Sequence, residues 1–155
     1  RNMDVQFVNL GFSGNGRGEP ALAHLINQIS GTSFIILDYE ANANETIMNT
    51  LGPFVEILRR EHPLTPILIM SKIRYAGASP GSSAYHLLMQ NRDFQKNLVE
   101  GRKAEGDDNI YFLDGSNVLG EDYFECTVDG SHPNDLGSYR IANALISNIE
   151  DILKK

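Results

Sequence analysis

The residues best suited to chemistry lie in one short turn, Asp129-Gly130-Ser131-His132-Pro133. An aspartate three residues before a histidine can place its carboxylate against the imidazole. That contact fixes the tautomer of the ring and stabilises the imidazolium when the ring takes a proton from a hydroxyl nucleophile. The same spacing also suits a surface turn whose side chains only cap the helix that follows. From this pair alone, both interpretations stand.

A glycine-rich string, NLGFSGNG at residues 9–16, supplies a second candidate. Its glycines either allow positive φ angles in a turn or present a bare backbone N–H that stabilises an oxyanion. The string contains neither the G-K-[ST] of a phosphate-binding loop nor the G-x-G-x-x-G of a dinucleotide site. It does not form G-x-S-x-G either, so Ser13 is interpreted as a turn hydroxyl and not as a nucleophile.

Asn42 and Asn44 lie in a third polar segment, DYEANAN at residues 38–44. An asparagine side-chain amide is a neutral donor suited to a developing oxyanion. Alternatively, both are ordinary loop residues, and Asn44 directly before Glu45 has the pattern of a helix N-cap. The choice of oxyanion donor between the two asparagines stays open at this point.

Two further residues, Arg74 and His86, are weaker candidates. Arg74 follows a predicted strand and His86 begins a predicted helix, so either side chain could touch a substrate. Cys126 is the one cysteine of the chain, which excludes an internal disulfide, and it has no activating pattern beside it. The histidines show no spacing such as H-E-x-x-H. We therefore expect no metal site and no cofactor.

Apolar runs and helical stretches alternate along the chain, which predicts the elements that position these residues. The runs are residues 5–10, 33–38, 66–70 and 109–114, and the predicted helices are 19–29, 45–60, part of 84–105, and 135–153. Near-continuous hydrophobicity is typical of parallel strands covered on both faces. The pattern predicts a three-layer α/β/α sandwich, in which sites form beyond the carboxyl ends of the strands. The helix at 45–60 should bend or restart at Gly52-Pro53.

The composition of the chain limits the classes of partner that it can bind. The net charge of −7 arises from 20 acidic and 13 basic residues, and no basic cluster stands out. This balance argues against a nucleic-acid partner or an anionic membrane surface, and fits a neutral or sugar-like substrate better than a polyanion. No apolar run is long enough to span a membrane, so we expect no membrane insertion. A length of 155 residues fits a single domain.

The order of the three polar segments resembles that of the SGNH hydrolase (GDSL-like lipase/acylhydrolase) superfamily. Its members carry a serine in a Gly-Asp-Ser-like block, a glycine, an asparagine and a closing Asp-x-x-His. The resemblance covers nearly the whole chain from residue 5 onward. It implies a flavodoxin-like sandwich and carboxylic ester hydrolysis without a cofactor, with His132 as base, Asp129 as its acid partner, and Gly14 and Asn42 in the oxyanion hole. The third segment departs from the usual Gly-x-Asn-Asp string, which keeps Asn44 as a competitor.

The resemblance also implies a strand and a Gly-x-Ser turn before residues 5–10, and no serine of this chain stands there. We therefore expect residues 1–155 to form one domain that lacks its first strand, with the nucleophilic serine upstream of Arg1. An upstream segment would complete the sheet between 5–10 and 33–38, so these two runs are predicted not to pair with each other. Localisation and oligomeric state stay open.

The predicted function is that of a serine esterase acting through an acyl-enzyme. Its substrate would be a small-molecule or carbohydrate ester, with acetyl or other short acyl groups favoured by analogy with the family. The alternative is a non-catalytic flavodoxin-like or SGNH-derived module that binds a ligand at the same strand ends without a nucleophile.

Overall fold

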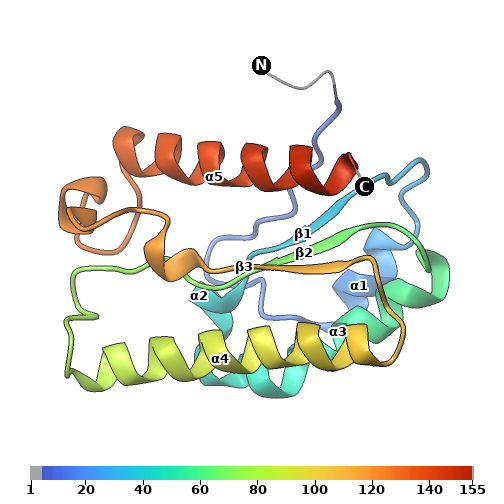
Figure 1. The fold of residues 1–155 in the computed structure, drawn as a ribbon, viewed down its shortest axis with the longest axis horizontal. Helices are drawn as coiled ribbons and strands as arrows, with labels where there is room; N and C mark the ends of the chain where they lie inside the picture. Colours follow the sequence, from blue (N-terminus) through green and yellow to red (C-terminus); the bar gives the residue numbers. More distant parts are fainter. Residues whose placement is uncertain (1–4, 155) are drawn as a thin grey trace.

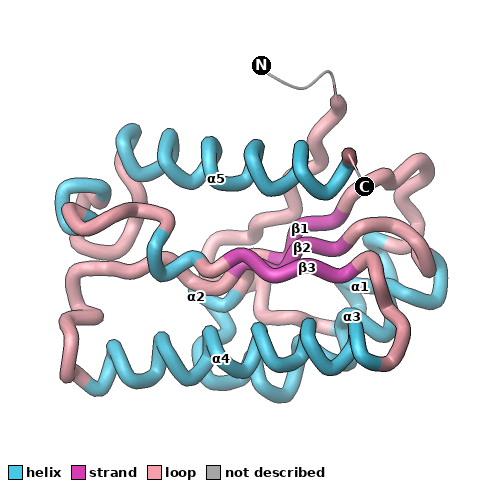
Figure 2. Tube along the Cα trace, viewed as in Figure 1, coloured by secondary structure: helices cyan, strands magenta, loops and turns pink. Residues whose placement is uncertain are grey.

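The structure is a computed structural model, and it describes residues 5–154. Three parallel strands form one sheet in the order β1 (Ile35–Leu37), β2 (Ile67–Met70) and β3 (Ile110–Leu113). Ile35 stands opposite Ile67, and Ile67 opposite Ile110. The strands lie side by side in the middle of the molecule, and β2 occupies the centre of the described sheet (Figure 2).

Helices cover both faces of this sheet (Figure 1). Three of them, α1 (Pro20–Ile26), α3 (Ile47–Glu61) and α4 (Ser83–Ala104), lie on one side, and α5 (Asp135–Leu153) lies on the other. Short helical turns follow the strands: α2 (Glu40–Ala43), η1 (Asn44–Thr46), η2 (Gly115–Asn117) and η3 (Tyr123–Cys126), where η denotes a 3₁₀ helix. The predicted three-layer α/β/α sandwich is confirmed.

The buried side of the helices is apolar in the way the sequence predicts. Leu51, Val55 and Leu58 of α3 are fully buried, and they belong to the same core cluster as Ile67 and Ile110 of the sheet. All four residues of β2 are at most 1% exposed, as a central strand covered on both faces requires. This core sets the plane from which the strand-end loops project.

Of the two outcomes predicted at Gly52-Pro53, a bend or a restart, the restart does not occur, because α3 continues through both residues. Proline has no N–H to donate to the carbonyl four residues earlier, which here belongs to Asn49. Pro53 and Asn49 are both exposed, so water can bond to the carbonyl that loses its donor. Apart from the segment at 5–10, the other predicted strands and helices end within three residues of the observed ones.

The prediction of a strand at residues 5–10 is wrong. This segment belongs to no sheet, and Val5, Phe7 and Val8 are 47%, 71% and 55% exposed. A strand is stable only when its N–H and C=O groups pair with a neighbour. No ladder joins this segment to β1 within the described residues, in line with the prediction that the two do not pair directly.

At the amino end of the sheet, Arg59 of α3 holds several chain segments together. Its guanidinium is bound to both carboxylate oxygens of Asp107, at 2.8 and 3.0 Å, and it also donates to the backbone carbonyls of His62, Thr65 and Asn109. The Arg59 and Asp107 side chains are only 10% and 14% exposed. Burial opposes the charge of Asp107, but the hydrogen bonds and charges of Arg59 and Arg102 outweigh it and hold the pKa of that carboxyl below its usual range.

Replacing Arg59 should therefore unfold the chain more easily. We expect Arg59→Met to lower the free energy of unfolding by about 3 kcal/mol, because Asp107 then keeps only Arg102 as a partner and the carbonyls of His62 and Thr65 lose the donor that Arg59 supplies. Urea titration measures the change. Lys96→Met is the control, because Lys96 forms an exposed pair with Glu100 and should cost less than about 0.5 kcal/mol. Equal effects of the two substitutions would contradict this account.

Candidate active site

The turn that carries Asp129 and His132 is a small hairpin at the carboxyl side of the sheet. Thr127 and Pro133 form an antiparallel bridge, and the Val128 N–H donates to the His132 carbonyl at 2.9 Å. Gly130 has a φ of 83°, a left-handed conformation that favours glycine. The backbone therefore brings the two candidate side chains to the same end of the hairpin.

Asp129 contacts His132 through both carboxylate oxygens. Its Oδ2 lies 2.7 Å from His132 Nδ1, and its Oδ1 accepts from the backbone N–H groups of His132 and Ser131 at 2.8 and 3.0 Å. This is the separation expected for an assembled pair. The His132 side chain is 78% exposed, which leaves Nε2 free to face an incoming group. Geometrically, the arrangement suits a general base whose tautomer the carboxylate fixes.

These hydrogen bonds also set the charge of Asp129. The backbone N–H of His132 is the largest influence, followed by the His132 ring and the backbone N–H of Ser131, and together they lower the pKa of the carboxyl to about 2. Asp129 is therefore ionised at any pH at which an esterase would be assayed.

The hairpin is fixed onto the start of α5. Asn134 caps this helix by accepting from the Gly137 N–H at 3.0 Å, and its side-chain amide donates to the Glu125 carbonyl at 2.7 Å. A Cβ at Gly137 would collide with the Cys126 carbonyl. Arg140, one turn further along α5, forms a bidentate ion pair with Asp122 at 2.6 and 3.0 Å. The histidine is thus held at the base of a long helix.

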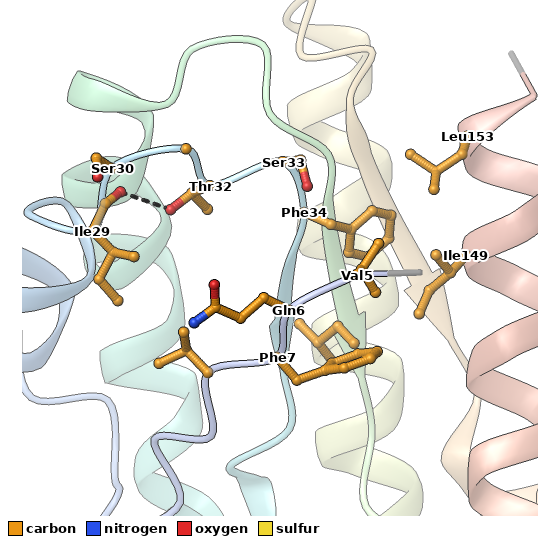
Figure 3. A pocket seen from close by; sticks show the side chains of 13 residues that line it. Val5, Gln6, Phe7, Ile29, Ser30, Thr32, Ser33, Phe34, Ile149 and Leu153 are labelled. Carbon is orange, nitrogen blue, oxygen red and sulfur yellow. Dashed lines mark hydrogen bonds between the residues drawn. The ribbon is translucent and has the colours of Figure 1, made fainter. Parts of the chain in front are cut away.

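A long groove runs beside β1, on the edge away from β2. It consists of two adjoining cavities of about 710 Å³ and about 500 Å³, which share Phe7, Val8 and Ile36 in their lining. Residues of the 5–12 segment border it on one side and β1 on the other, and Ile149 and Leu153 of α5 face it at one end (Figure 3). Most of the lining is apolar, although it is open to solvent.

The backbone of β1 is unpaired along this groove. The Ile35 N–H donates to the Pro66 carbonyl at 2.9 Å, so Ile35 and Leu37 direct their backbone groups toward β2. Backbone groups of successive strand residues point to opposite sides, so the N–H and C=O of Ile36 point into the groove. This edge is able to accept a further strand.

The predicted oxyanion residues lie in different surroundings. Asn42, on α2, is half-buried and lines the larger cavity. Asn44 is exposed and has a φ of 48°, and its carbonyl accepts from Asn91 at 3.2 Å, which fits a backbone turn between α2 and η1. Gly14 lies in an open loop with nothing near it that a Cβ would touch, and its carbonyl accepts from Arg17 at 3.2 Å. Neither Gly14 nor His132 is among the residues that line the groove.

Sequence reasoning overlooked Glu40, which organises the floor of this region. Its carboxylate is 1% exposed, and Oε2 accepts from the Lys72 backbone N–H and from the Gln95 side chain, both at 2.7 Å. These bonds link the carboxyl ends of β1 and β2 to α4. Since Asn42 lies two residues after Glu40, the buried carboxylate also fixes the turn that presents Asn42. An isolated glutamate in a polar loop has no sequence signal that would have identified it.

Asp38 ends β1 and borders the larger cavity. Solvent reaches its surface through the open groove, but the surrounding protein replaces much of its hydration. This desolvation, with a smaller contribution from the negative charge of Glu40, raises the pKa of Asp38 from its ordinary 3.8 to about 6. The neutral form of Asp38 therefore persists to a higher pH, about 6, than that of an ordinary aspartate.

A carboxyl whose pKa is higher in the folded than in the unfolded chain binds more protons when folded. Stability should therefore fall as the pH rises from about 4 to about 6. We expect Asp38→Asn to flatten this part of the pH dependence in urea unfolding, whereas Asp108→Asn, at an exposed site before β3, should leave it unchanged.

A carbon-13 titration of the Asp38 carboxyl tests the cause directly. Glu40→Gln keeps both hydrogen bonds but removes the charge, so it should lower the Asp38 pKa. An Asp38 pKa near its ordinary value in the unmodified chain would contradict the described environment.

The two weaker candidates are placed differently. His86 is exposed near the start of α4, with its ring 6.4 Å from that of Tyr85. Arg74 lies in the loop after β2, with its guanidinium carbon 4.2 Å from the centre of the Tyr123 ring and 5.7 Å from that of Tyr85. No hydrogen bond joins Arg74 to His86 within the described residues. Arg74 approaches the hairpin region, and His86 shows no contact with it in the described part of the chain.

Residues 5–154 contain neither a metal site nor a membrane-spanning helix. No group of three or more His, Cys, Asp or Glu side chains there has the arrangement of a metal site. No helix in the same range combines the length and the apolar composition that crossing a membrane requires.

Comparison with known families decides the classification. The sequence profile of the GDSL-like Lipase/Acylhydrolase family matches residues 1–150. The chain belongs to this family. The family match covers almost the whole chain. The chain also has the α/β layers described above and the contact between Asp129 and His132.

Two solved structures are similar to the GDSL-like chain. A protein classed as a GDSL-like lipase from Bacteroides ovatus ATCC 8483 is 34% identical, with a TM-score of 0.85 over 96% of this chain. The salicylyl-acyltransferase SsfX3 from a tetracycline biosynthetic pathway is 23% identical, with a TM-score of 0.74 over 90% of this chain, and shows a likeness of fold alone. The chain spans 44% and 43% of these two proteins. No curated protein matches it.

Proposed function

We propose that this GDSL-like domain hydrolyses carboxylic esters through an acyl-enzyme, with His132 as general base and Asp129 as its orienting partner. The observation that carries the proposal is the 2.7 Å contact between Asp129 Oδ2 and His132 Nδ1 in a chain of this family. The carboxylate is ionised and bound to Nδ1, so Nε2 is the nitrogen available to a nucleophile.

The nucleophile in this proposal is a serine on a strand that fills the groove beside β1. Its Oγ attacks the ester carbonyl carbon while His132 Nε2 takes the hydroxyl proton. The tetrahedral intermediate then expels the alcohol, which receives that proton from His132, and leaves the serine acylated. Water attacks the acyl group, gives its proton to Nε2, and releases the carboxylic acid as the serine regains its proton.

Asn42 and Gly14 are the proposed donors to the oxyanion. The Asn42 amide lies in the lining of the larger cavity, close to the carboxyl end of β1, where a neighbouring strand would end. The Gly14 N–H belongs to a loop without surrounding side chains, which can approach a substrate closely. The positions of Asn42 and Asn44 favour Asn42, because only Asn42 borders the groove.

The substrate class follows from the family and from the site's openness. We propose a small-molecule or carbohydrate ester with a short acyl group, since Asp129 and His132 lie in an exposed hairpin that is open to a small ester. The competing function is that of a non-catalytic module that binds a ligand. Unlike the esterase, this module needs no nucleophilic serine.

Kinetics of a completed domain test the mechanism. In a longer chain, in which an apolar strand and a Gly-x-Ser turn precede Arg1, p-nitrophenyl acetate should be hydrolysed. His132→Ala and Asp129→Asn should each lower kcat/KM by about 10⁴-fold, because proton transfer from the serine is lost or misdirected. Asn42→Ala should cost about 10²–10³-fold through the oxyanion.

His24→Ala serves as control, because His24 is an exposed histidine of α1, and this variant should keep full activity. A completed chain that binds ester without turning it over, or a His132→Ala variant as active as its parent, would favour the binding module.

Amide hydrogen exchange tests whether the proposed serine-bearing strand lies in the groove beside β1. In the 155-residue chain, the Ile36 amide should exchange at least about tenfold faster than that of Leu37, because only Leu37 faces β2. In the longer chain the two amides should become similarly protected, since Ile36 gains a partner. Fast exchange of Ile36 in an active longer chain would place the serine strand elsewhere.

A further inference from the structure

Arg74 is a cation without an anionic partner at the proposed active site. It forms no ion pair or hydrogen bond within residues 5–154, and its Nε is buried without a partner. A buried donor left unsatisfied costs free energy that most folded chains avoid. Of the chain's other arginines, Arg59, Arg92, Arg102 and Arg140 all have carboxylate partners. Arg74 therefore has unused binding capacity.

Two aromatic rings hold this guanidinium in place. Tyr123, on η3, contacts its carbon at 4.2 Å, and Tyr85, on α4, approaches it at 5.7 Å. Such contacts favour the charged guanidinium but leave its N–H donors without an acceptor. The guanidinium of Arg74 thus lies between rings from two helical elements, η3 and α4, while its N–H donors have no acceptor within the described residues.

The loop of Arg74 also touches the hairpin of the Asp–His pair. The Ala76 N–H donates to the Gly130 carbonyl at 2.8 Å, and a Cβ at Gly130 would lie 3.2 Å from Ala76 Cβ. Gly130 lies between Asp129 and His132 in sequence. An anion on Arg74 would therefore lie beside the hairpin that carries the proposed general base.

We propose that Arg74 binds a carboxylate group of the substrate and so selects esters that carry a negative charge beside the scissile bond. The planar fork of guanidinium N–H donors matches a carboxylate in geometry as well as in charge. The overall charge of −7 suggested a neutral substrate, but a single carboxylate is recognised by local charge, and the site places an unpaired arginine beside the hairpin. This inference names a substrate class and so rests on the proposed function.

Binding of benzoate to the 155-residue chain tests the proposal without any need for the serine. Nitrogen-15 spectra report the Arg74 Nε–H together with the backbone of the hairpin. We expect saturable benzoate binding in the range of about 1 mM, typical of a fragment, and at least about tenfold weaker binding of the neutral isostere benzamide. Arg74→Gln should weaken benzoate binding by about tenfold or more.

Two controls separate this site from alternatives. Arg60→Gln removes the same charge from an exposed arginine at the far end of α3 and should leave binding unchanged. His132→Asn should bind benzoate as the parent does, whereas loss of binding in that variant alone would show that the anion sits on the histidine and would overturn the proposal. Equal binding of benzoate and benzamide, or full binding by Arg74→Gln, would overturn it as well.

A second variant keeps the test decisive if Arg74→Gln does not fold. Arg74→Lys keeps the charge near the two rings but lacks the forked donors, so benzoate binding should fall severalfold, and unchanged binding would contradict carboxylate recognition. Because these measurements need no turnover, benzoate binding through Arg74 would stand even if the longer chain proved inactive. The reverse outcome, hydrolysis without such binding, would refute the inference alone.

Discussion

The unpaired edge of β1 is the constraint on which the rest of this structure depends. β2 is paired on both sides and fully buried, and β1 and β3 form the two edges of the described sheet. Beside β1, in contrast, the backbone of Ile36 meets an open groove, and three features follow from that one fact. Residues 5–10 form no ladder in the described part of the chain, α5 leaves part of its apolar side facing a cavity, and Asp38 borders the groove at the end of β1. A strand that fills the groove would form backbone hydrogen bonds with the open edge of β1 and cover the apolar lining of the groove.

The Asp–His pair, by comparison, hardly depends on the groove. Its geometry comes from contacts within a dozen residues: the bridge between Thr127 and Pro133, the left-handed Gly130, and the Asn134 cap of α5. Arg140 then ties this unit to Asp122. Local interactions of this kind form as soon as the helix forms, so the proposed base and its partner are preorganised whether or not the sheet is complete.

Sequence reasoning succeeded where local patterns determine structure. The period of residues 135–153 predicted α5, and the spacing of three positions from Asp129 to His132 was enough to predict their contact. It failed where tertiary context decides. The string at 5–10 is as apolar as a buried strand, but a strand also needs a neighbour, and that information lies outside the segment. Pro53 likewise breaks helices in general, and only its exposed position explains why α3 continues. For the same reason, the roles of Glu40 and of the rings around Arg74 could not be predicted from the sequence. The partners of Glu40 are 32 or more residues away, and the two rings come from two other elements.

The proposed site therefore has two parts, one that forms from local contacts and one that depends on the open edge of β1. The half with His132 is built from local contacts and is already assembled. The half with Asn42 is built on the turn after β1, fixed below by Glu40 but open toward the groove. An oxyanion hole needs its donors aimed at one point, and a donor on an unfilled edge lacks the neighbour that would define that point. A strand entering the groove would therefore do two things at once: it would bring the nucleophile to the assembled histidine, and it would close the side of the cavity from which Asn42 must act. In this view the chemistry of the domain is controlled by completion of its sheet, because the same backbone pairing that stabilises the fold also aligns the reacting groups.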